Sequence, residues 1–319
     1  MQMLSRVADS LYWLGRYAER IETNAHIIYT QMDHMLEQSR EDSSYKKEWD
    51  YVLRICGHIE DYKERYDGYY LKQMNYYLLF DENNFDSISY LIKSIRNNAR
   101  NARDIIPNEL WEEWNEFYLA MQNGAFPIEF SVPNTAIFLG RLRKTALSAT
   151  GIIDSLMTRD ECFQFLKIGK WIERSEKTAI IAHELLKNQN EDSLNREFAI
   201  NFGLQLTNTL EEYNRRFRSR KPDEVLNFIV GDIKCTRSIA YGLRKIKKTV
   251  LDIEESKIRL YANEMFQALE ELEQLVQIDS TSLTIGERRE WINTIGEKLT
   301  SFGPIFSKTY YLTAPILVD

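Results

Sequence analysis

Apolar residues recur at steps of three and four along almost the whole chain. In residues 5–38 they stand at Leu11, Leu14, Ala18, Ile21, Ala25 and Ile28. This spacing places apolar side chains on one face of an α-helix, whereas a half-buried β-strand would show alternation. The same pattern predicts helices at residues 46–80, 87–106, 108–122, 134–157, 160–188, 193–218, 223–231, 237–250, 255–277 and 287–311. We therefore predict an all-α protein, a multi-helix bundle.

Few residues interrupt these helical segments. Glycine (13) and proline (6) together make up roughly 6% of the 319 residues, about half of their usual combined share. The predicted breaks lie at Pro107, at Pro222 and between Asn123 and Pro133, where residues 126–132 are extended at most. Because β-sandwiches and glycine-rich nucleotide-binding α/β folds need many tight turns, this composition argues against both classes.

Two stretches of the chain share the pattern Gly-[Arg/Lys]-[Tyr/Trp]-x-Glu-Arg-x-Glu-x-x-Ala, at residues 15–25 and 169–179. A second pair aligns residues 81–95 with 232–246, and a third aligns 147–155 with 299–307. The three offsets lie between 151 and 154 residues, which indicates a duplicated unit of about 150 residues. We predict a single helical domain, residues 1–319, built from the halves 1–157 and 158–319 packed against each other.

The charge balance and the cysteines narrow the class of protein. The 41 Lys and Arg residues and 48 Asp and Glu residues give a net charge of −7, whereas nucleic-acid binding usually needs a basic surface. No run approaches about 18 uncharged apolar residues, and the N-terminus lacks the hydrophobic block of a signal peptide. Cys56, Cys162 and Cys235 are scattered, which suits free thiols. We expect a cytoplasmic protein that binds neither nucleic acid nor a membrane.

The repeated glutamates lie among small and apolar residues on a helical wheel. Glu19 and Glu22 share a face with Gly15, and the matching glutamates of the second copy share one with Gly169. Two carboxylates three residues apart repel each other, and an ionised carboxylate on a partly buried face needs a partner. Glycine inside a helix costs up to about 1 kcal/mol relative to alanine, so the two glycines predict a close helix contact at the glutamates.

Three explanations of these glutamates stay open. In the first, arginines pair with the carboxylates and lock helices in register. In the second, the carboxylates bind a metal, although helical bundles usually add a Glu-x-x-His motif and the spacing here is Glu-x-x-Glu. In the third, arginines in a cleft bind an anionic group while the carboxylates bind an amine or act as acid and base.

The candidate residues follow from these explanations. The carboxylates, which are also the candidates for catalysis, are Glu19, Glu22, Glu173 and Glu176. The candidate arginines are Arg20, Arg174 and the stripe Arg96, Arg100 and Arg103, with Arg16 and Arg237 as further binding residues. The chain has no Walker loop, Gly-x-Gly-x-x-Gly, Gly-x-Ser-x-Gly or His-Glu-x-x-His motif. We expect no cofactor and no metal, and favour a protein without catalytic activity.

The first helix opens with Ser-Arg-Val-Ala-Asp-Ser-Leu-Tyr-Trp-Leu-Gly-Arg-Tyr-Ala-Glu-Arg-Ile-Glu at residues 5–22. Further motifs stand at residues 96–104, 109–115, 165–179 and 235–239. Together they strongly resemble the bacterial alpha-E family, an all-helical domain with characteristic glutamates, over nearly the whole chain. Thr236 departs from the family's usual proline before the pair Arg237-Ser238.

The resemblance implies a cellular setting more than an activity. Members of the family lie beside, or are fused to, circularly permuted ATP-grasp ligases and transglutaminase-like peptidases, which implies ATP-dependent peptide or amide-bond formation in the bacterial cytoplasm. We expect an accessory protein that scaffolds the ligase or presents its amine or peptide substrate, with the ligase and the transglutaminase-like protein as partners. The alternative is an enzyme that uses the paired glutamates and arginines on a peptide or acyl-phosphate substrate.

Overall fold

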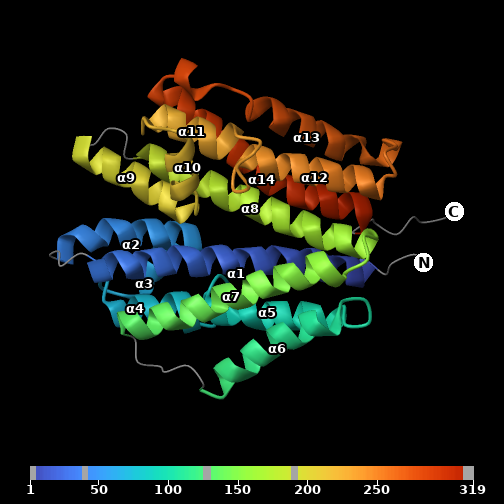
Figure 1. Ribbon diagram of the computed structural model, residues 1–319, viewed down its shortest axis with the longest axis horizontal. Coiled ribbons are helices and arrows are strands. Elements are labelled where there is room, and N and C mark those ends of the chain that lie inside the picture. Colours follow the sequence, from blue (N-terminus) through green and yellow to red (C-terminus); the bar gives the residue numbers. More distant parts are fainter. Residues whose placement is uncertain (1–4, 38–41, 125–130, 188–192, 312–319) are drawn as a thin grey trace. The chain divides into compact units, whose positions relative to one another are not determined.

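The computed structural model describes residues 5–37, 42–124, 131–187 and 193–311, and every regular element in these ranges is a helix (Figure 1). The predicted all-α fold is therefore confirmed. The chain divides into two compact units. Unit 1 consists of Met1–Arg16 and Arg159–Asp319, and unit 2 consists of Tyr17–Thr158. The prediction of one domain made of two duplicated halves stays a prediction.

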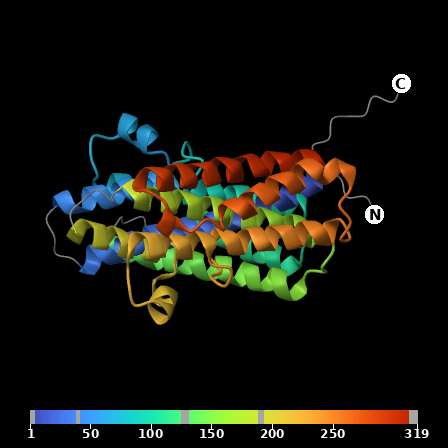
Figure 2. The same cartoon turned by 90° about the horizontal axis from the view of Figure 1, so that it is seen from above.

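Unit 1 is organised around the long helix α8. Its elements are the first turns of α1 (Ser5–Glu37), α8 (Glu161–Lys187), α9 (Ser193–Leu206), α10 (Leu210–Arg216), α11 (Pro222–Gly231), α12 (Ile239–Ile253), η2 (Leu260–Ala262), α13 (Asn263–Leu275), η3 (Ser280–Ser282) and α14 (Ile285–Tyr310). Helices α9, α11, α12 and α14 all contact α8, and α14, red in Figure 2, also contacts α13. Because α8 is covered from several sides, polar as well as apolar residues along it are buried.

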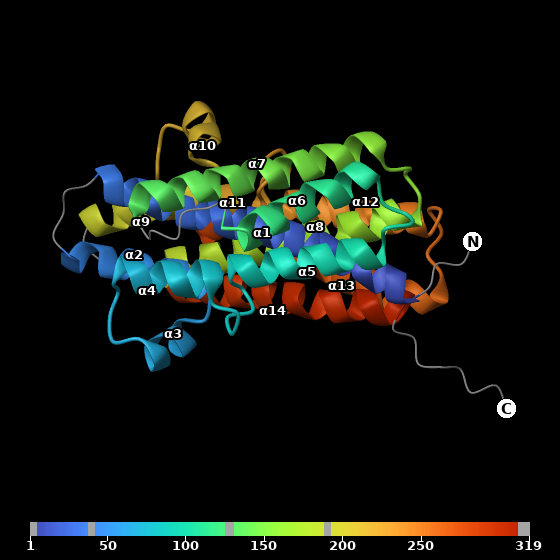
Figure 3. The same ribbon diagram turned by 90° about the horizontal axis from the view of Figure 1, so that it is seen from below.

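Unit 2 begins within α1 and buries large aromatic side chains. Its further elements are α2 (Asp42–Cys56), α3 (Ile59–Arg65), α4 (Leu71–Asn75), the π-helical turn η1 (Tyr76–Phe80), α5 (Ile88–Asn101), α6 (Asn108–Gln122) and α7 (Val132–Leu156). Helix α6 contacts both α5 and α7 (Figure 3). Trp49, Trp114, Tyr62 and Tyr77 are fully buried, so aromatic residues fill much of this core.

Two predicted helical segments prove to be interrupted, and a third, 255–277, becomes helical only at η2 and α13, because Glu255 and Ser256 adopt left-handed φ angles of 51° and 60°. The segment 46–80 ends its first helix at Cys56, next to Gly57, and ends α3 at Arg65, shortly before Gly68. The segment 193–218 breaks at Asn208, whose φ of 56° is left-handed. Asparagine tolerates this conformation and commonly ends a helix. The predictions of one continuous helix over 46–80 and one over 193–218 were therefore wrong. The breaks are short, and the three- and four-residue spacing of apolar residues continues on both sides of them.

Similar contacts hold the short helices of each unit at an offset of 151 residues. The hydroxyl of Tyr62 donates to the carbonyl of Gly68 at 2.6 Å, and that of Tyr213 donates to the carbonyl of Ser219 at 2.8 Å. An arginine then pairs with an aspartate in the loop that follows. These pairs are Arg65 with Asp81 and Arg216 with Asp232. The contacts agree in kind with the predicted duplication, and a common origin of the halves stays a prediction.

The predicted extended stretch 126–132 mostly lies outside the described residues, which exclude 125–130. Within the described part, the Ser131 side chain accepts a hydrogen bond from the backbone N–H of Asn134 at 3.4 Å and caps α7, which begins at Val132. In the described ranges, no helix combines the length and the apolar character that crossing a membrane requires.

Candidate functional site

The N-terminal turns of α1 cross α8 in unit 1 at two glycines, as the rarity of glycine predicted. A Cβ atom on Gly15 would clash with the carbonyl oxygen of Leu166, and a Cβ on Gly169 would clash with that of Tyr12. The two backbones are therefore in direct contact, which a larger residue at either position would prevent. This crossing brings Arg16 of α1 next to the glutamates of α8.

Arg16 binds both glutamates of the second copy of the motif. Its Nη1 and Nη2 donate to Oε1 and Oε2 of Glu176 at 3.1 and 2.6 Å, which makes a bidentate pair. Its Nε lies 2.7 Å from Oε2 of Glu173, although this N–H has no acceptor in hydrogen-bond geometry among the described residues. The Arg16, Glu173 and Glu176 side chains are 8%, 1% and 16% exposed. The three form a nearly buried ionic cluster.

Helix α14 contacts the same cluster at Tyr12 of α1. The Tyr12 hydroxyl accepts a hydrogen bond from Nη1 of Arg16 at 3.3 Å, and its ring stacks on Phe306 at 5.6 Å between centroids. A Cβ atom on Gly303 would lie 2.9 Å from the Tyr12 oxygen. Gly303 therefore leaves room for the hydroxyl, and the cluster joins α1, α8 and α14.

The environment keeps the arginine of this cluster charged. Burial by itself would lower the pKa of Arg16, but Glu173 and Glu176 outweigh it and raise the pKa well above the ordinary value. Burial also raises the pKa of Tyr12, so its hydroxyl stays protonated at neutral pH. The cluster is thus an internal salt bridge in which Glu176 is the most accessible carboxylate.

The neighbouring arginine on α8 holds the loop that precedes α12. Nη1 of Arg174 donates to the carbonyl of Thr236 at 3.4 Å, and its guanidinium lies 4.9 Å from the centre of the Trp171 ring. The Thr178 hydroxyl donates to the carbonyl of Arg237 at 2.9 Å. Arg174 therefore stabilises a loop, and Arg237 lies within that loop.

The first copy of the motif holds the matching loop in unit 2. Nη1 of Arg20 lies 2.9 Å from Oδ1 of Asp86, and Asn24 donates to the Asp86 carbonyl at 3.3 Å. Asp86 directly precedes Ser87, which caps α5. Glu19 and Glu22 are both buried on α1, with 3% and 8% exposure. Arg20 and Arg174, the arginines of the two repeated motifs, therefore anchor the loops before α5 and before α12.

The arginine stripe of α5 faces α6. Nε of Arg96 donates to Oδ1 of Asn115 at 2.8 Å, and its guanidinium lies over the ring of Tyr118 at 4.7 Å. The guanidinium of Arg103 lies 5.1 Å from the Trp111 ring centre. In the described structure, Arg96, Arg100 and Arg103 form no ion pair with a carboxylate. The stripe is therefore not a partner of the glutamates, because this face of α5 meets the aromatic face of α6.

The cluster contains residues that the sequence pattern did not single out as partners. Arg16 was predicted as a binding residue, but its pairing with the glutamates was not. Tyr12 and Gly303 were not predicted at all. One usable signal is that the position after the paired glycine is basic in both copies, with Lys170 in the second. A repeated cation beside a repeated carboxylate suggests a pair between helices.

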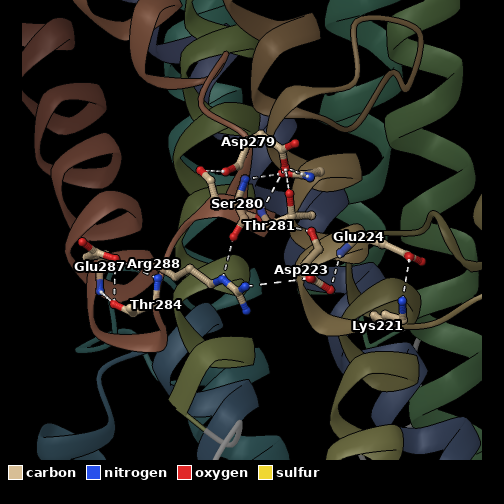
Figure 4. Close-up of polar contacts among 11 residues, drawn as sticks. Lys221, Asp223, Glu224, Asp279, Ser280, Thr281, Thr284, Glu287 and Arg288 are labelled. Atoms are coloured by element: carbon tan, nitrogen blue, oxygen red, sulfur yellow. Dashed lines mark hydrogen bonds and ion pairs between the residues drawn. The ribbon is translucent and has the colours of Figure 1, made fainter.

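A second polar network, not expected from the sequence, joins the loop before α14 to α11 (Figure 4). Asp279 accepts hydrogen bonds from Asn227 Nδ2 at 2.7 Å and from the backbone N–H of Thr281 at 2.9 Å. Nε of Arg288 donates to the Ser280 carbonyl at 2.8 Å. The network fixes the start of α14, where the sequence Thr-x-x-Glu forms a capping box.

Within the residues that the structure describes, no three His, Cys, Asp or Glu side chains are grouped so as to bind a metal ion. The described cysteines form no disulfide; Cys56 and Cys235 are buried, and Cys162 is partly exposed.

Comparison with known families identifies the chain. The model of a family named Alpha-E, described as a predicted alpha-helical domain with a conserved ER motif, matches residues 3–311. Glu19-Arg20 and Glu173-Arg174 are Glu-Arg pairs of the kind named in that description, as are Glu64-Arg65 and Glu287-Arg288. No curated protein and no solved structure matches the chain. The resemblance inferred from the motifs is confirmed.

Proposed function

This chain belongs to the Alpha-E family, and we propose that it is an accessory protein of an ATP-dependent peptide-ligation system. In this role it scaffolds a circularly permuted ATP-grasp ligase or presents the ligase's amine or peptide substrate in the bacterial cytoplasm. A transglutaminase-like protein is the second proposed partner. The setting comes from what the family resemblance implies about neighbouring proteins.

The observation that carries the proposal is that the charged residues of the repeated motif in unit 1 bind other residues of the same unit. Glu173 is 1% exposed and lies against Arg16, while both oxygens of Glu176 accept hydrogen bonds from the same guanidinium. Arg174 is engaged with the loop before α12. Side chains committed to one another in this way hold helices in register, which suits a rigid framework that other proteins bind.

The test is reconstitution with a circularly permuted ATP-grasp ligase from the same organism, the proposed partner. We expect the two purified proteins to elute together from a size-exclusion column. We also expect the ligase to form amide bonds faster, or to give a different product, when this protein is added. If the ligase neither binds the protein nor changes its rate or product, the proposal fails.

The alternative, an enzyme acting on a peptide or acyl-phosphate, rests on the partial exposure of Glu176, whose side chain is 16% exposed. A Glu176→Gln variant separates the two. If Glu176 acts as an acid or base, the variant keeps its melting temperature and loses its effect on the ligation reaction. If the residue only pairs with Arg16, the variant loses stability, and its effect on the reaction returns under conditions where it is fully folded.

A further inference from the structure

A cavity of about 330 Å³ lies between α8 and α12 in unit 1, away from the ionic cluster of Arg16. Four basic side chains line it: Arg159, Lys167, Lys245 and Lys248. The acidic residue among the lining is Asp252. This concentration of positive charge stands out in a chain whose net charge is −7. A concave site with several cations attracts anions and raises their local concentration.

Aromatic rings contact two of the cations at this cavity, Arg159 and Lys167. The guanidinium of Arg159 lies 4.2 Å from the centre of the Phe163 ring. The ammonium of Lys167 lies 5.4 Å from the same ring and 5.7 Å from that of Trp171. Such contacts attract a cation to the ring face. Phe163 and Trp171 also line the cavity, so the site has an apolar wall beside the charges.

Lys245 and Lys248 differ from Lys247, which lies between them on α12, in their partners. Lys247 lies 2.6 Å from Oε2 of Glu273. In the described structure Lys248 makes no hydrogen bond or ion pair, and the ammonium of Lys245 makes only a contact with the Tyr241 ring at 5.2 Å. The two lysines that face the cavity therefore keep their donors for a ligand.

The packing of α12 does not explain these two lysines. At the offset of 151 residues that relates the sequence halves, Lys245 and Lys248 stand where α5 has Ser94 and Asn97. Neutral residues thus occupy the matching positions of a helix of similar length and pattern. Lys245 and Lys248 are therefore not part of the pattern that the two helices share.

A neutral polar side chain, Gln164, also lines the cavity. Gln164 is 7% exposed and lines the cavity, and its side-chain amide has no hydrogen-bond partner among the described residues. An amide can both donate and accept, so this side chain can hydrogen-bond a polar group of a ligand in the cavity. A molecule bound here can replace water at this amide.

We propose that this cavity binds a small phosphate ester that carries an aromatic or apolar group. The phosphate, with two negative charges, would lie among the lysines, because ammonium groups offer several rotatable donors to phosphate oxygens. The organic group would lie against Trp171 and near the Gln164 amide. A volume of about 330 Å³ is at the lower end of the range found for small-molecule sites. The proposal is independent of any ligase partner.

The test is calorimetric titration of the full-length protein with phenyl phosphate, inorganic phosphate and benzoate at low ionic strength. We expect phenyl phosphate to bind most tightly, since it has both the dianion and the ring. The Lys248→Ala variant should bind it about tenfold more weakly. Lys247→Ala, which removes an equal charge from the next position on α12, should bind it within about twofold of the wild type.

Three results would overturn the proposal. The first is no detectable binding of phenyl phosphate at millimolar concentration. The second is equal weakening by Lys248→Ala and Lys247→Ala, which would mean a diffuse attraction to the helix. The third is benzoate binding as tightly as phenyl phosphate, which would remove the argument for a dianion. Circular dichroism and melting temperature verify that each variant is folded.

A second variant tests the Gln164 amide separately. Leucine has nearly the same shape and needs no hydrogen bond, so we expect Gln164→Leu to fold with unchanged or higher stability. It should bind phenyl phosphate several-fold more weakly than the wild type. Equal affinity in this variant would show that the amide does not face the ligand and would contradict the proposed placement.

Discussion

Arg16 is held in unit 1 by two carboxylates and a tyrosine hydroxyl, with little access to water. A buried ion pair gains little over a well-packed apolar substitute, but removal of one partner leaves an uncompensated charge in a low-dielectric interior. Glu173, which is 1% exposed, would lose the guanidinium nitrogen that lies 2.7 Å from its Oε2. Replacement of Arg16 therefore lowers stability mainly because buried carboxylates lose their cation.

We predict that Arg16→Met lowers the free energy of unfolding by about 3–5 kcal/mol, as is typical when one partner of a buried pair is removed. Urea denaturation followed by circular dichroism measures the change. Lys308→Met is the matched control, since Lys308 and Glu264 pair at 3.0 Å with side chains 71% and 58% exposed. An exposed pair contributes about 0–1 kcal/mol. Equal small losses in both variants would contradict the prediction.

The need for a cation near the glutamates follows from sequence, whereas the identity of that cation does not. Glu173 and Glu176 lie on an apolar face of α8, and a buried carboxylate requires a partner. Which arginine fulfils this need depends on where another helix crosses. Arg96 and Arg103 have suitable charge and spacing but lie over aromatic rings of α6. Only the three-dimensional contact of Gly15 with α8 brings Arg16 into place.

Helix α1 approaches α8 closely because two glycines remove the side chains that would separate their backbones. Glycine lowers helix stability relative to alanine, so a glycine inside a helix needs a compensating contact. At Gly15 and Gly169 that contact is with the opposite backbone. At Gly296 of α14 a Cβ atom would have open space. Substitution of Gly296 therefore reports on helix propensity alone, whereas substitution of Gly15 or Gly169 also reports on the packing of the two helices.

Alanine substitutions at these positions should change stability in opposite directions. We predict that Gly15→Ala and Gly169→Ala each destabilise the protein by about 1–3 kcal/mol, because the helices must move apart. Gly296→Ala should stabilise it by up to about 1 kcal/mol through helix propensity. Thermal unfolding monitored at 222 nm gives the order. A stabilised Gly15→Ala variant would show that the close contact is absent.

The loop before α12 depends on an ionised aspartate. Burial raises the pKa of Asp232, but hydrogen bonds from Arg216 and from the backbone N–H groups of Lys234 and Cys235 outweigh this and lower it below 3.8 overall. A pKa that is lower in the folded protein means that the carboxylate stabilises the fold above the unfolded-state pKa of about 3.9. This stabilisation is lost as the pH falls through the folded-state pKa.

The pH dependence of an Asp232→Asn variant tests this reasoning. We predict that the variant is less stable than the wild type at pH 7, and that the difference shrinks as the pH falls below about 4. Urea unfolding at several pH values measures it. Asp104→Asn is the control, because Asp104 is exposed and makes no hydrogen bond or ion pair in the described structure. A gap that does not change with pH would contradict the assignment.

The ends of a helix were predictable where residues that break helices flank it. Helix α6 begins and ends at Asn108 and Gln122 as the periodicity indicates. The breaks at Gly57 and at Asn208 escaped prediction, because an interruption of a few residues returns the apolar residues to the same face. Local glycine and asparagine chemistry, weighed against that period, would have located both.

At the scale of the whole molecule, the compact units do not coincide with the predicted sequence halves. The boundary between residues 158 and 159 lies close to the predicted 157/158, yet Met1–Arg16 belong to the unit formed by the second half. These residues supply Tyr12, Gly15 and Arg16 to α8 and α14. A repeat in sequence locates equivalent elements, whereas the packing decides which of them share a core, and periodicity holds no information on that choice.

This assignment predicts how the chain responds to division between residues 158 and 159. The piece 159–319 lacks Arg16, so Glu173 is buried without its cation, and it lacks Tyr12, so the Phe306 ring loses its stacking partner. We predict that this piece alone unfolds without a cooperative transition, and that adding the piece 1–158 restores one. Adding 1–158 with Arg16→Met should restore it less, by about 3–5 kcal/mol. Urea titrations of each piece and of the mixtures measure this, and cooperative unfolding of 159–319 alone, as stable as the mixture, would contradict it.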